Sequence, residues 1–307
     1  MSDYYPLVSI VVITYNSSKY ILETLESIKQ QTYKNLELII TDDCSKDNTV
    51  ALCQDWLDVN KHGFIRTKLI TVSHNTGVSA NCNRGYQEAQ GEWIKCIAGD
   101  DCLCLDGIEK YLNFVSLHQD ALICHSNVLV FKNEFREENM MKNIFYIPKV
   151  FQKNIDSHKQ FLILCLSNVI AAPSVFMNKA LFKKMGGFDE EISMCEDWPM
   201  WLKITRQGYP FFYLNDYTVK YRMHSASTVG NGTVNFLFKR FFEANLIVYK
   251  KYIRFQAPKF IAFMQKYDYC IRKFLDRVNC NKKGFWYAFI YKLLDAPFLI
   301  VYKLMVK

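Results

Sequence analysis

Short apolar runs alternate with helical segments through the first hundred residues, and this alternation constrains the fold more than any other feature of the chain. Residues 7–13, LVSIVVI, form a continuous apolar and β-branched run of the kind found in strands that are buried on both faces. Three more strand-like runs follow at 36–41, 68–72 and 92–98, with helical patterns between them. This order predicts an α/β fold built around a parallel sheet.

Polar residues stand at the end of three of these runs. Thr14–Asn16 follow the first run, Asp42–Asp43 the second and Asp100–Asp101 the fourth. In open α/β sheets ligands bind beyond the carboxyl ends of the strands, where these groups would gather. Asp is also common in turns and at helix caps, so the pair at 100–101 taken alone is compatible with a plain turn as well as with a bound divalent cation. Three such strand ends favour a ligand site over three unrelated turns.

The second half of the chain is less regular up to about residue 230 and then changes character. We expect strands over 121–131 and 209–215, and a helix that begins at Lys179 and ends at a pair of glycines. The segment 196–208, EDWPMWLKITRQG, predicts a helix with acidic residues in its first turn and a glycine just past its end. From residue 234 onward the pattern is helical, aromatic and basic.

Charge is unevenly distributed along the chain. The 307 residues carry a formal net charge of +8, and residues 239–307 alone hold 15 Lys and Arg against 4 Asp and Glu, a net of +11. The first 238 residues are therefore slightly acidic, at −3. A basic segment attached to an acidic body suggests an anionic partner for that segment, either nucleic acid or a membrane surface.

The 11 cysteines show no C-x-x-C spacing, and several lie inside apolar runs that are predicted to be strands. An odd number without metal-type spacing indicates reduced, mostly buried thiols and hence a cytoplasmic protein. The N-terminus, MSDYYPLVSIVVITYN, lacks the basic and apolar regions of a secretory signal, and we expect it to form the first strand.

Five segments occur in an order and spacing that resemble a known family: VSIVVITYN, ELIITDDCSKDNT, HNTGVSANCNRGYQEAQGEWIKCIAGDD, GGFDE and EDWPMWLKI. They resemble the family-2 inverting glycosyltransferases of the GT-A fold, over roughly residues 6–225. The resemblance implies a Rossmann-like, mostly parallel mixed sheet flanked by helices, as a catalytic domain over 1–233 with a helical C-terminal extension over 234–307. It also implies a metal-dependent hexosyltransferase, which moves a sugar from a nucleotide diphosphosugar to an acceptor hydroxyl.

The acidic pair after the fourth strand matches the metal site of that family. Asp101 corresponds to the metal-contacting carboxylate, and Asp100 to the neighbour that reaches the ribose or the metal shell. His224, in YRMHSAS, is implied to contact the metal or the diphosphate. A hard cation such as Mn²⁺ or Mg²⁺ would offset the charge of the leaving nucleoside diphosphate. Many relatives carry another Asp at the position of Ala98, so this chain supplies fewer carboxylates. Further candidates in the last segment are Arg222 and Ser227.

The resemblance places the nucleotide at the ends of the first two strands. Asp43 corresponds to the residue that accepts a hydrogen bond from a uracil-like N3–H, and Arg84 to an arginine near the base or diphosphate. Tyr15 corresponds to an aromatic that packs on the base, although without the family match it is equally an ordinary strand-end aromatic. Relatives often carry another Arg where Cys82 stands. The implied nucleotide-sugar contacts are Thr14, Tyr15, Asn16, Asp43, Arg84 and Asp100.

Asp197, in CEDWPMW, corresponds to the family's catalytic base, which takes the proton of the acceptor hydroxyl during a one-step inversion. Glu196 is adjacent, and both acids would also suit the positive end of a helix without any catalysis. Asp189, in GGFDE, is expected to organise the turn and the acceptor loop. Further acceptor-loop candidates are Glu196 and Trp198.

The last 24 residues, GFWYAFIYKLLDAPFLIVYKLMVK, are apolar but interrupted by charges and by Pro297. A membrane-spanning helix needs ~20 nearly uncharged residues, so this segment does not predict one. On a helical wheel its charged residues fall on one side, which gives an amphipathic surface suited to an anionic membrane. A helix packed on the catalytic domain is the alternative, and nucleic acid is disfavoured because no recognition module is visible. The charged residues are Lys292, Asp295, Lys303 and Lys307.

Together these features predict a cytoplasmic glycosyltransferase that uses a UDP-linked or similar donor to extend a bacterial surface polysaccharide or lipid-linked glycan. Residues 239–307 would contact the inner face of the cell membrane. One rival is a catalytically silent GT-A module that only binds nucleotide or scaffolds a complex. A second rival is a nucleotidyltransferase, but TYNSSKY lacks the glycine-rich, basic phosphate loop that such an enzyme would show after its first strand.

Overall fold

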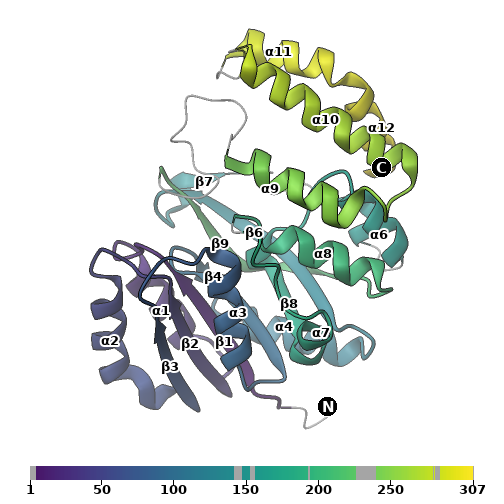
Figure 1. Ribbon diagram of the computed structural model, residues 1–307. Coiled ribbons are helices and arrows are strands. Elements are labelled where there is room, and N and C mark those ends of the chain that lie inside the picture. Colours follow the sequence, from purple (N-terminus) through teal and green to yellow (C-terminus); the bar gives the residue numbers. More distant parts are fainter. Residues whose placement is uncertain are drawn as a thin grey trace.

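The computed structural model describes residues 5–141, 147–152, 156–192, 194–225, 240–278, 280 and 284–306, and within these residues nine strands form one sheet (Figure 1). The strand order is β3-β2-β1-β4-β8-β6-β9-β5, with β7 paired to β6. The strands are β1 (Val8–Thr14), β2 (Leu36–Asp42), β3 (Arg66–Thr71), β4 (Trp93–Ala98), β5 (Cys102–Leu103), β6 (Ile123–Lys132), β7 (Met140–Met141), β8 (Val175–Asn178) and β9 (Phe212–Met223). The helices are α1 (Ile21–Lys29), α2 (Thr49–Asn60), α3 (Val78–Glu88), α4 (Gly107–Leu117), α5 (Lys149–Gln152), α6 (Ser157–Leu164), α7 (Lys179–Lys184), α8 (Asp197–Arg206), α9 (Arg240–Val248), α10 (Lys259–Arg277), α11 (Phe285–Leu294) and α12 (Ala296–Val306).

The strands β1 to β4 run parallel to one another, which confirms the α/β fold expected from the first hundred residues. β1 pairs with β2 along its whole length, from Val8 opposite Leu36 to Thr14 opposite Asp42. All seven residues of β2 and six of the seven in β1 are buried, as expected for strands covered on both faces. The carboxyl ends of β1, β2 and β4 therefore meet at one edge of the sheet, where the predicted ligand groups stand.

The sheet becomes mixed beyond β4. β8 runs antiparallel to β4 and β6, and β5 antiparallel to β9, while β6 and β9 are parallel. β9 is longer than the expected strand over 209–215, since it spans Phe212–Met223. The polar residues Asn215 and Asp216 suggest a strand end, but the β6–β9 register shifts there and pairing resumes at Tyr217. The added length carries the end of β9 to the end of β4.

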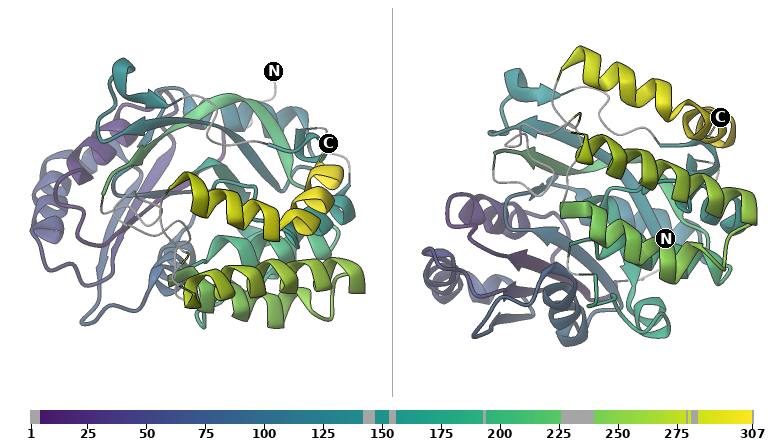
Figure 2. Two further views of the ribbon diagram at one scale, coloured as in Figure 1. Left: turned by 90° about the horizontal axis from the view of Figure 1, so that it is seen from above. Right: turned by 45° about the horizontal axis from the view of Figure 1, so that its top comes forward.

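Helices cover both faces of the sheet, and each face has its own apolar core (Figures 1 and 2). Val8, Ile10 and Val12 of β1 pack with α1, α2 and α4, whereas Val11 packs with α3 and the helices of the second half. This division follows from the alternation of side chains along a strand. All 11 cysteines are free thiols; five are buried, five are partly buried and Cys270 is exposed, so the buried fraction is smaller than predicted.

The C-terminal extension packs on the α/β domain through its inner face (Figures 1 and 2). Val248, Ile253 and Phe298 belong to the same buried cluster as Trp201 of α8. This contact matches the alternative of a packed helical segment, while the outer face is open to other partners. The expected domain boundary at 233/234 lies outside the described residues. Of the helices that are described, none combines the length and hydropathy needed to cross a bilayer.

One part of the helical-wheel prediction fails in the last segment. Lys292 and Lys303 are exposed, but Asp295 is fully buried. α11 and α12 are separate helices that meet at Asp295, so one continuous wheel does not describe this stretch. Burial, followed by the charge of Asp268, raises the pKa of Asp295 to about 7. Asp295 is therefore part of a polar cluster inside the extension, and Lys307 lies outside the described residues.

Candidate active site

Asp43 follows β2, and its carboxylate is enclosed by the loop that leads into α3. Thr76 donates its N–H and its hydroxyl, at 3.0 and 2.6 Å, and Gly77 donates its N–H at 2.8 Å. Arg84 of α3 donates from Nη2 at 2.8 Å. Burial alone would raise the pKa of Asp43, but the hydrogen bonds from Thr76, Arg84 and Gly77 outweigh burial and hold the pKa below its ordinary value. Asp43 is thus a charged acceptor that also fixes the start of α3.

The three residues at the end of β1 differ in their surroundings. Thr14 is buried, and its hydroxyl donates to Asp42 Oδ2 at 2.8 Å. Asn16, with a positive φ of 53°, donates its N–H to Ser45 Oγ at 2.8 Å. Tyr15 is 50% exposed. Thr14 and Asn16 therefore join the β1 and β2 loops, whereas Tyr15 presents its ring to solvent, where a nucleotide base could stack on it.

The two acids after β4 differ in exposure, since Asp101 is buried and Asp100 is partly exposed. Asp101 is 1% exposed and accepts the N–H of Arg222 at 2.8 Å. Burial and the charge of Asp100 raise the pKa of Asp101, and Arg222 opposes this rise. Asp100 Oδ2 lies 2.9 Å from His224 Nε2. His224 is thus paired with Asp100, while the Asp101 carboxylate accepts the backbone N–H of Arg222 on β9.

Arg222 of β9 fixes the position of this acidic pair. Its guanidinium is buried and lies 4.4 Å from the ring centre of Tyr20 and 3.9 Å from that of Phe135. Nε donates to the carbonyl of Asp100 at 2.7 Å, and Nη2 forms an ion pair with Glu23 of α1. The sequence marks Arg222 only as one more candidate near His224. Its partners are far apart along the chain, so spacing could not reveal them. Ser227 lies outside the described residues.

Asp100 and His224 carry side-chain atoms of the types that bind divalent cations. A carboxylate oxygen and an imidazole nitrogen lie 2.9 Å apart at a partly exposed edge of the sheet. Within the described residues, no group of three or more His, Cys, Asp or Glu side chains is arranged for a metal. Mg²⁺ in particular is often bound by one or two protein groups, with substrate phosphates and water as the other ligands. Two protein groups are therefore sufficient for a cation that binds together with a diphosphate.

Asp197 and Glu196, at the N-terminus of α8, both resist ionisation. Asp197 Oδ2 accepts from Asn168 Nδ2 at 2.8 Å, and Oδ1 accepts the N–H of Trp198 at 2.7 Å. Burial raises the pKa of Asp197 in spite of these bonds, and burial with the charge of Asp197 raises the pKa of Glu196 to about 8. A helix N-terminus acting alone would lower both pKa values. Burial therefore dominates, and Asn168, which the motifs do not reveal, orients Asp197.

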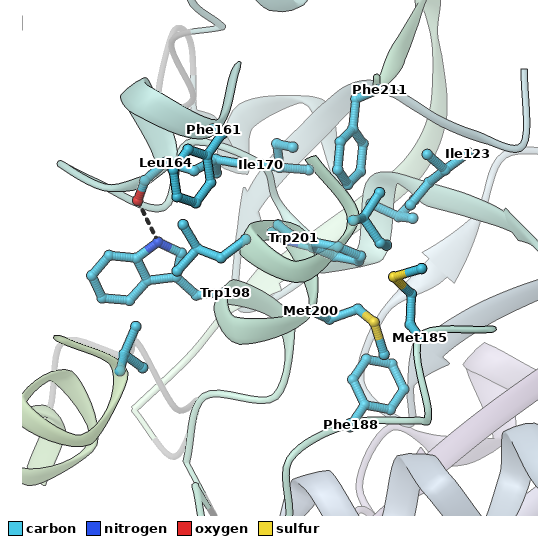
Figure 3. Close-up of a cluster of buried hydrophobic side chains, with 14 of the residues drawn as sticks. Ile123, Phe161, Leu164, Ile170, Met185, Phe188, Trp198, Met200, Trp201 and Phe211 are labelled. Carbon is cyan, nitrogen blue, oxygen red and sulfur yellow. Dashed lines mark hydrogen bonds between the residues drawn. The ribbon is translucent and has the colours of Figure 1, made fainter. Parts of the chain in front are cut away.

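Two residues predicted for the acceptor loop, Trp198 and Asp189, have hydrogen-bond partners within the fold. Trp198 is 5% exposed within the apolar cluster of Figure 3, and its indole donates to the carbonyl of Leu164 at 2.7 Å. Asp189 accepts from Lys251 Nζ at 2.7 Å and from the Tyr252 hydroxyl at 2.6 Å. Asp189 thus fastens the GGFDE turn to the C-terminal extension, and Trp198 anchors α8 in the core, because a buried indole needs one acceptor and apolar neighbours.

Tyr221 of β9 lies within electrostatic reach of both acidic pairs. Burial raises its pKa above the ordinary value, and the charges of Asp101, Asp100, Asp197 and Glu196 raise it further. The β4 pair and the α8 pair therefore both lie near Tyr221. Tyr15 and Asp43, at the ends of β1 and β2, and Arg84 of α3 form a second group of predicted residues.

This sheet order, with its flanking helices and helical C-terminal region, is the GT-A fold of glycosyltransferases. The chain belongs to glycosyl transferase family 2, whose sequence profile matches residues 9–184. The protein is thus a glycosyltransferase, as the five sequence segments predict. The matched range contains β2 to β4, α3 and all of β1 except Val8.

Relatives with assigned names agree at the level of the family. An uncharacterized glycosyltransferase of Rickettsia typhi is 26% identical over 227 residues, which cover 74% of this chain and 67% of the relative. TuaG of Bacillus subtilis, provisionally named a teichuronic acid biosynthesis glycosyltransferase, is 23% identical over 75% of this chain and 84% of its own length. The match covers only 31% of a longer relative from Rickettsia bellii.

Solved structures support the fold. TarS residues 1–349 of S. aureus, in complex with UDP-GlcNAc, gives a TM-score of 0.62 at 19% identity, over 87% of this chain and 72% of the other. The mannosyltransferase PcManGT of Pyrobaculum calidifontis, in complex with GDP-Man and Mn²⁺, gives 0.56 at 15% identity, over 99% of this chain and 73% of the other.

Proposed function

We propose that this protein is a metal-dependent, inverting glycosyltransferase that moves a sugar from a UDP-linked donor to an acceptor hydroxyl. The observations that carry the proposal are the contact of Asp100 Oδ2 with His224 Nε2 at 2.9 Å and the fixed Asp197 carboxylate, which accepts from Asn168 and from the Trp198 N–H. The Asp100 and His224 pair suits a diphosphate with its cation, and the Asp197 carboxylate suits a proton acceptor. The complexes of TarS with UDP-GlcNAc and of PcManGT with GDP-Man and Mn²⁺ support a nucleotide-sugar donor and a divalent cation here.

The donor base binds at the ends of β1 and β2. Tyr15 offers an exposed ring for stacking, and Asp43 is an acceptor that stays charged because its pKa is lowered. Arg84 is bonded to Asp43 and Thr76, at 2.8 and 2.7 Å, so its main role is to orient Asp43. Thr14 and Asn16 act indirectly, through the loops that shape the site.

Asp100 and His224 hold the divalent cation, Mn²⁺ or Mg²⁺. When bound, this cation neutralises the negative charge that develops on the leaving diphosphate. Asp101 and Arg222 are positioning residues in this proposal, since the Asp101 carboxylate is occupied by the Arg222 N–H and Arg222 Nε holds the Asp100 carbonyl. In this proposal Asp100 therefore takes the cation-binding role that the sequence resemblance implies for Asp101.

Asp197 acts as the catalytic base. The acceptor oxygen attacks the anomeric carbon while its proton passes to an Asp197 oxygen, and the bond from that carbon to the diphosphate breaks on the opposite face, which inverts the configuration. Asn168 and the Trp198 N–H fix both carboxylate oxygens and leave lone pairs for the proton. Its raised pKa makes Asp197 a stronger base than an ordinary carboxylate.

The acceptor is a bacterial surface or lipid-linked glycan, and the enzyme works in the cytoplasm at the membrane surface. The name of TuaG supports a polysaccharide role. The extension exposes large apolar side chains beside its 15 basic residues, and Phe285 and Trp286 are 75% and 71% exposed. Such a surface suits an anionic headgroup layer. The other exposed residues of α10 to α12 include Phe260, Phe263, Phe274, Phe289, Leu293, Ile300 and Leu304.

The test is a thermal-shift panel of nucleotide sugars with Mn²⁺ or Mg²⁺, followed by hydrolysis assays on the sugars that bind. A donor stabilises the fold by ~2.7 kcal/mol at 100 times its dissociation constant. We expect slow, metal-dependent hydrolysis of one UDP-sugar, with loss of that hydrolysis when EDTA removes the metal. Binding without any hydrolysis or transfer would support the catalytically silent module instead.

A further inference from the structure

A third hydrogen bond reaches the Asp197 carboxylate from Cys195, two residues earlier in the chain. The Cys195 Sγ donates to Asp197 Oδ1 across 3.7 Å, and the thiol is partly buried. Thiols are weak hydrogen-bond donors, so this contact adds to the bonds from Asn168 and the Trp198 N–H without replacing either. The proposed base is thus held by three donors.

The Cys195 thiol keeps its proton at working pH. A free thiol ionises near pH ~8.5. Burial raises the pKa of Cys195, and the charges of Asp197 and Glu196 raise it further. Since the thiolate is the nucleophilic form of cysteine, a thiol that stays protonated is a donor and not a nucleophile. Cys195 therefore acts on its neighbours through its S–H group.

The three donors are divided unequally between the two oxygens of Asp197. Oδ1 accepts the Trp198 N–H at 2.7 Å and the Cys195 S–H at 3.7 Å. Within the described part of the chain, Oδ2 accepts one hydrogen bond, from Asn168 Nδ2 at 2.8 Å. An ionised carboxylate offers about two lone pairs on each oxygen. Oδ1 is therefore saturated, whereas Oδ2 keeps one free lone pair.

We propose that Cys195 is a positioning residue for the base: its S–H occupies the second lone pair of Asp197 Oδ1 and leaves Oδ2 as the atom that receives the acceptor's proton. In the transfer step the acceptor O–H bond breaks, its proton bonds to Oδ2, and its oxygen attacks the anomeric carbon. The bond from that carbon to the diphosphate breaks, and its electron pair leaves with the diphosphate. The S–H bond stays intact throughout. The inference rests on the proposed function, with Asp197 as the base.

The Cys195 bond also acts on the ionisation of Asp197. Burial raises the pKa of Asp197, and the bonds from Asn168, the Trp198 N–H and Cys195 oppose this rise. A donor that bonds to the ionised form favours that form. Removal of the S–H group should therefore raise the pKa of the base.

The other titratable groups around this base stay neutral while it ionises, except for its neighbour Glu196. Glu196 has its pKa raised to about 8 by burial and by the charge of Asp197. Cys82 and Tyr86 of α3 and Tyr221 of β9 have their pKa values raised, in part by the charges of these acids. The first ionisation of the acid pair, on the acid side of the rate profile, thus belongs mainly to Asp197.

The first test is the pH profile of kcat/KM for hydrolysis of the UDP-sugar found by thermal shift, where water replaces the acceptor hydroxyl. Cys195→Ala should move the acid limb upward by ~0.3–1 pH unit, which is a ~2- to 10-fold loss of rate below the limb. Cys195→Ser keeps a donor at this position and should bring the limb back toward its parental place. Cys104→Ala removes another partly buried thiol, whose charged neighbours are Lys110, Lys220, Asp106 and Asp216, and should leave the limb unchanged.

The second test needs no turnover and uses the infrared S–H stretch of Cys195, isolated as the difference between the parent protein and Cys195→Ala. Asp197→Ala gives the frequency of the same thiol without its acceptor. Across the acid limb the parental band should move only part of the way to that frequency, because Oδ1 stays an acceptor when the proton binds Oδ2. A move all the way would place the proton on Oδ1 and overturn the proposal.

The proposal is also overturned if the Cys195 band matches that of Asp197→Ala at every pH, or if Cys195→Ala keeps the parental acid limb. A limb in Cys195→Ser that equals that of Cys195→Ala would show that the volume of sulfur matters and not its proton, with the same result. If the parent protein hydrolyses no donor, or Asp197→Asn keeps parental turnover, the failure lies in the proposed function. The S–H band then still decides whether Cys195 donates to Oδ1.

Discussion

Replacing Glu196 by Gln should stabilise the folded protein above neutral pH. Burial and the charge of Asp197 raise the pKa of Glu196 from 4.5 to about 8. A glutamate of the unfolded chain ionises near ~4.3. Between about pH 4.5 and 8 the folded protein therefore keeps a proton that the unfolded chain has released, and the free energy of unfolding falls as pH rises through this window.

The size of the effect follows from the same pKa values. One pKa unit corresponds to ~1.4 kcal/mol, so the full difference would destabilise the protein by at most ~5 kcal/mol. Glu196 is only half-buried, and solvent screens part of its charge, so we expect a loss of about 2–3 kcal/mol across the window. Glu196→Gln removes this loss. Its Tm should therefore exceed that of the parent by about 4–8 °C at pH 8.5 and should match the parent at pH 5.

Thermal unfolding followed by circular dichroism between pH 5 and 9 measures both curves. Glu138→Gln makes the same chemical change at an exposed glutamate, away from α8. It should leave the parental pH profile unaltered. If Glu196→Gln and the parent lose Tm in parallel as pH rises, Glu196 ionises normally. The start of α8 would then be open to solvent, and Asp197 would be no stronger a base than an ordinary carboxylate.

Three further predictions test other parts of the site. Asp197→Asn should lower turnover by ~10²–10⁴ with donor affinity nearly unchanged, measured by steady-state kinetics and donor titration; near-normal turnover would move the base to Glu196. Asp100→Ala and His224→Ala should each abolish the metal dependence of donor binding in thermal-shift assays; a parental response to Mn²⁺ in both would refute the cation site. Trp286→Ser combined with Phe289→Ser should reduce co-sedimentation with anionic vesicles while donor hydrolysis persists; binding equal to the parent would exclude these side chains from a membrane contact.

The sequence predicts the first half of the fold well because its signals are local. Each strand from β1 to β4 is a short apolar run, and each lies within two residues of its expected ends. The carboxyl ends of parallel strands share an edge, so the grouping of Asp43 with Tyr15 follows from topology alone. The end of β9 was harder to predict, because Asn215 and Asp216 resemble a turn in sequence but form a register shift within a continuing strand.

Roles that depend on contacts between distant segments could not be predicted. Asp100 and Asp101 are neighbours of the same type, and only the Arg222 N–H, 121 residues beyond Asp101, separates a buried carboxylate from an accessible one. Asn168 orients Asp197 from 29 residues away without any motif. The sequence assigns Asp295 to a polar stripe only if α11 and α12 form a single helix, and they do not.

Asp43 and Asp197, two residues of one type, have pKa values that shift in opposite directions. Asp43 is surrounded by N–H and hydroxyl donors, which outweigh burial and lower its pKa, so it remains a charged acceptor. Asp197 is partly buried but has fewer donors and a second acid beside it, and its pKa rises. A group that must hold a donor base through a fixed hydrogen bond gains from staying ionised, whereas a group that must receive a proton gains from a raised pKa. In the proposed function, the number of donors around each carboxylate, rather than the identity of the residue, therefore separates the binding role of Asp43 from the catalytic role of Asp197.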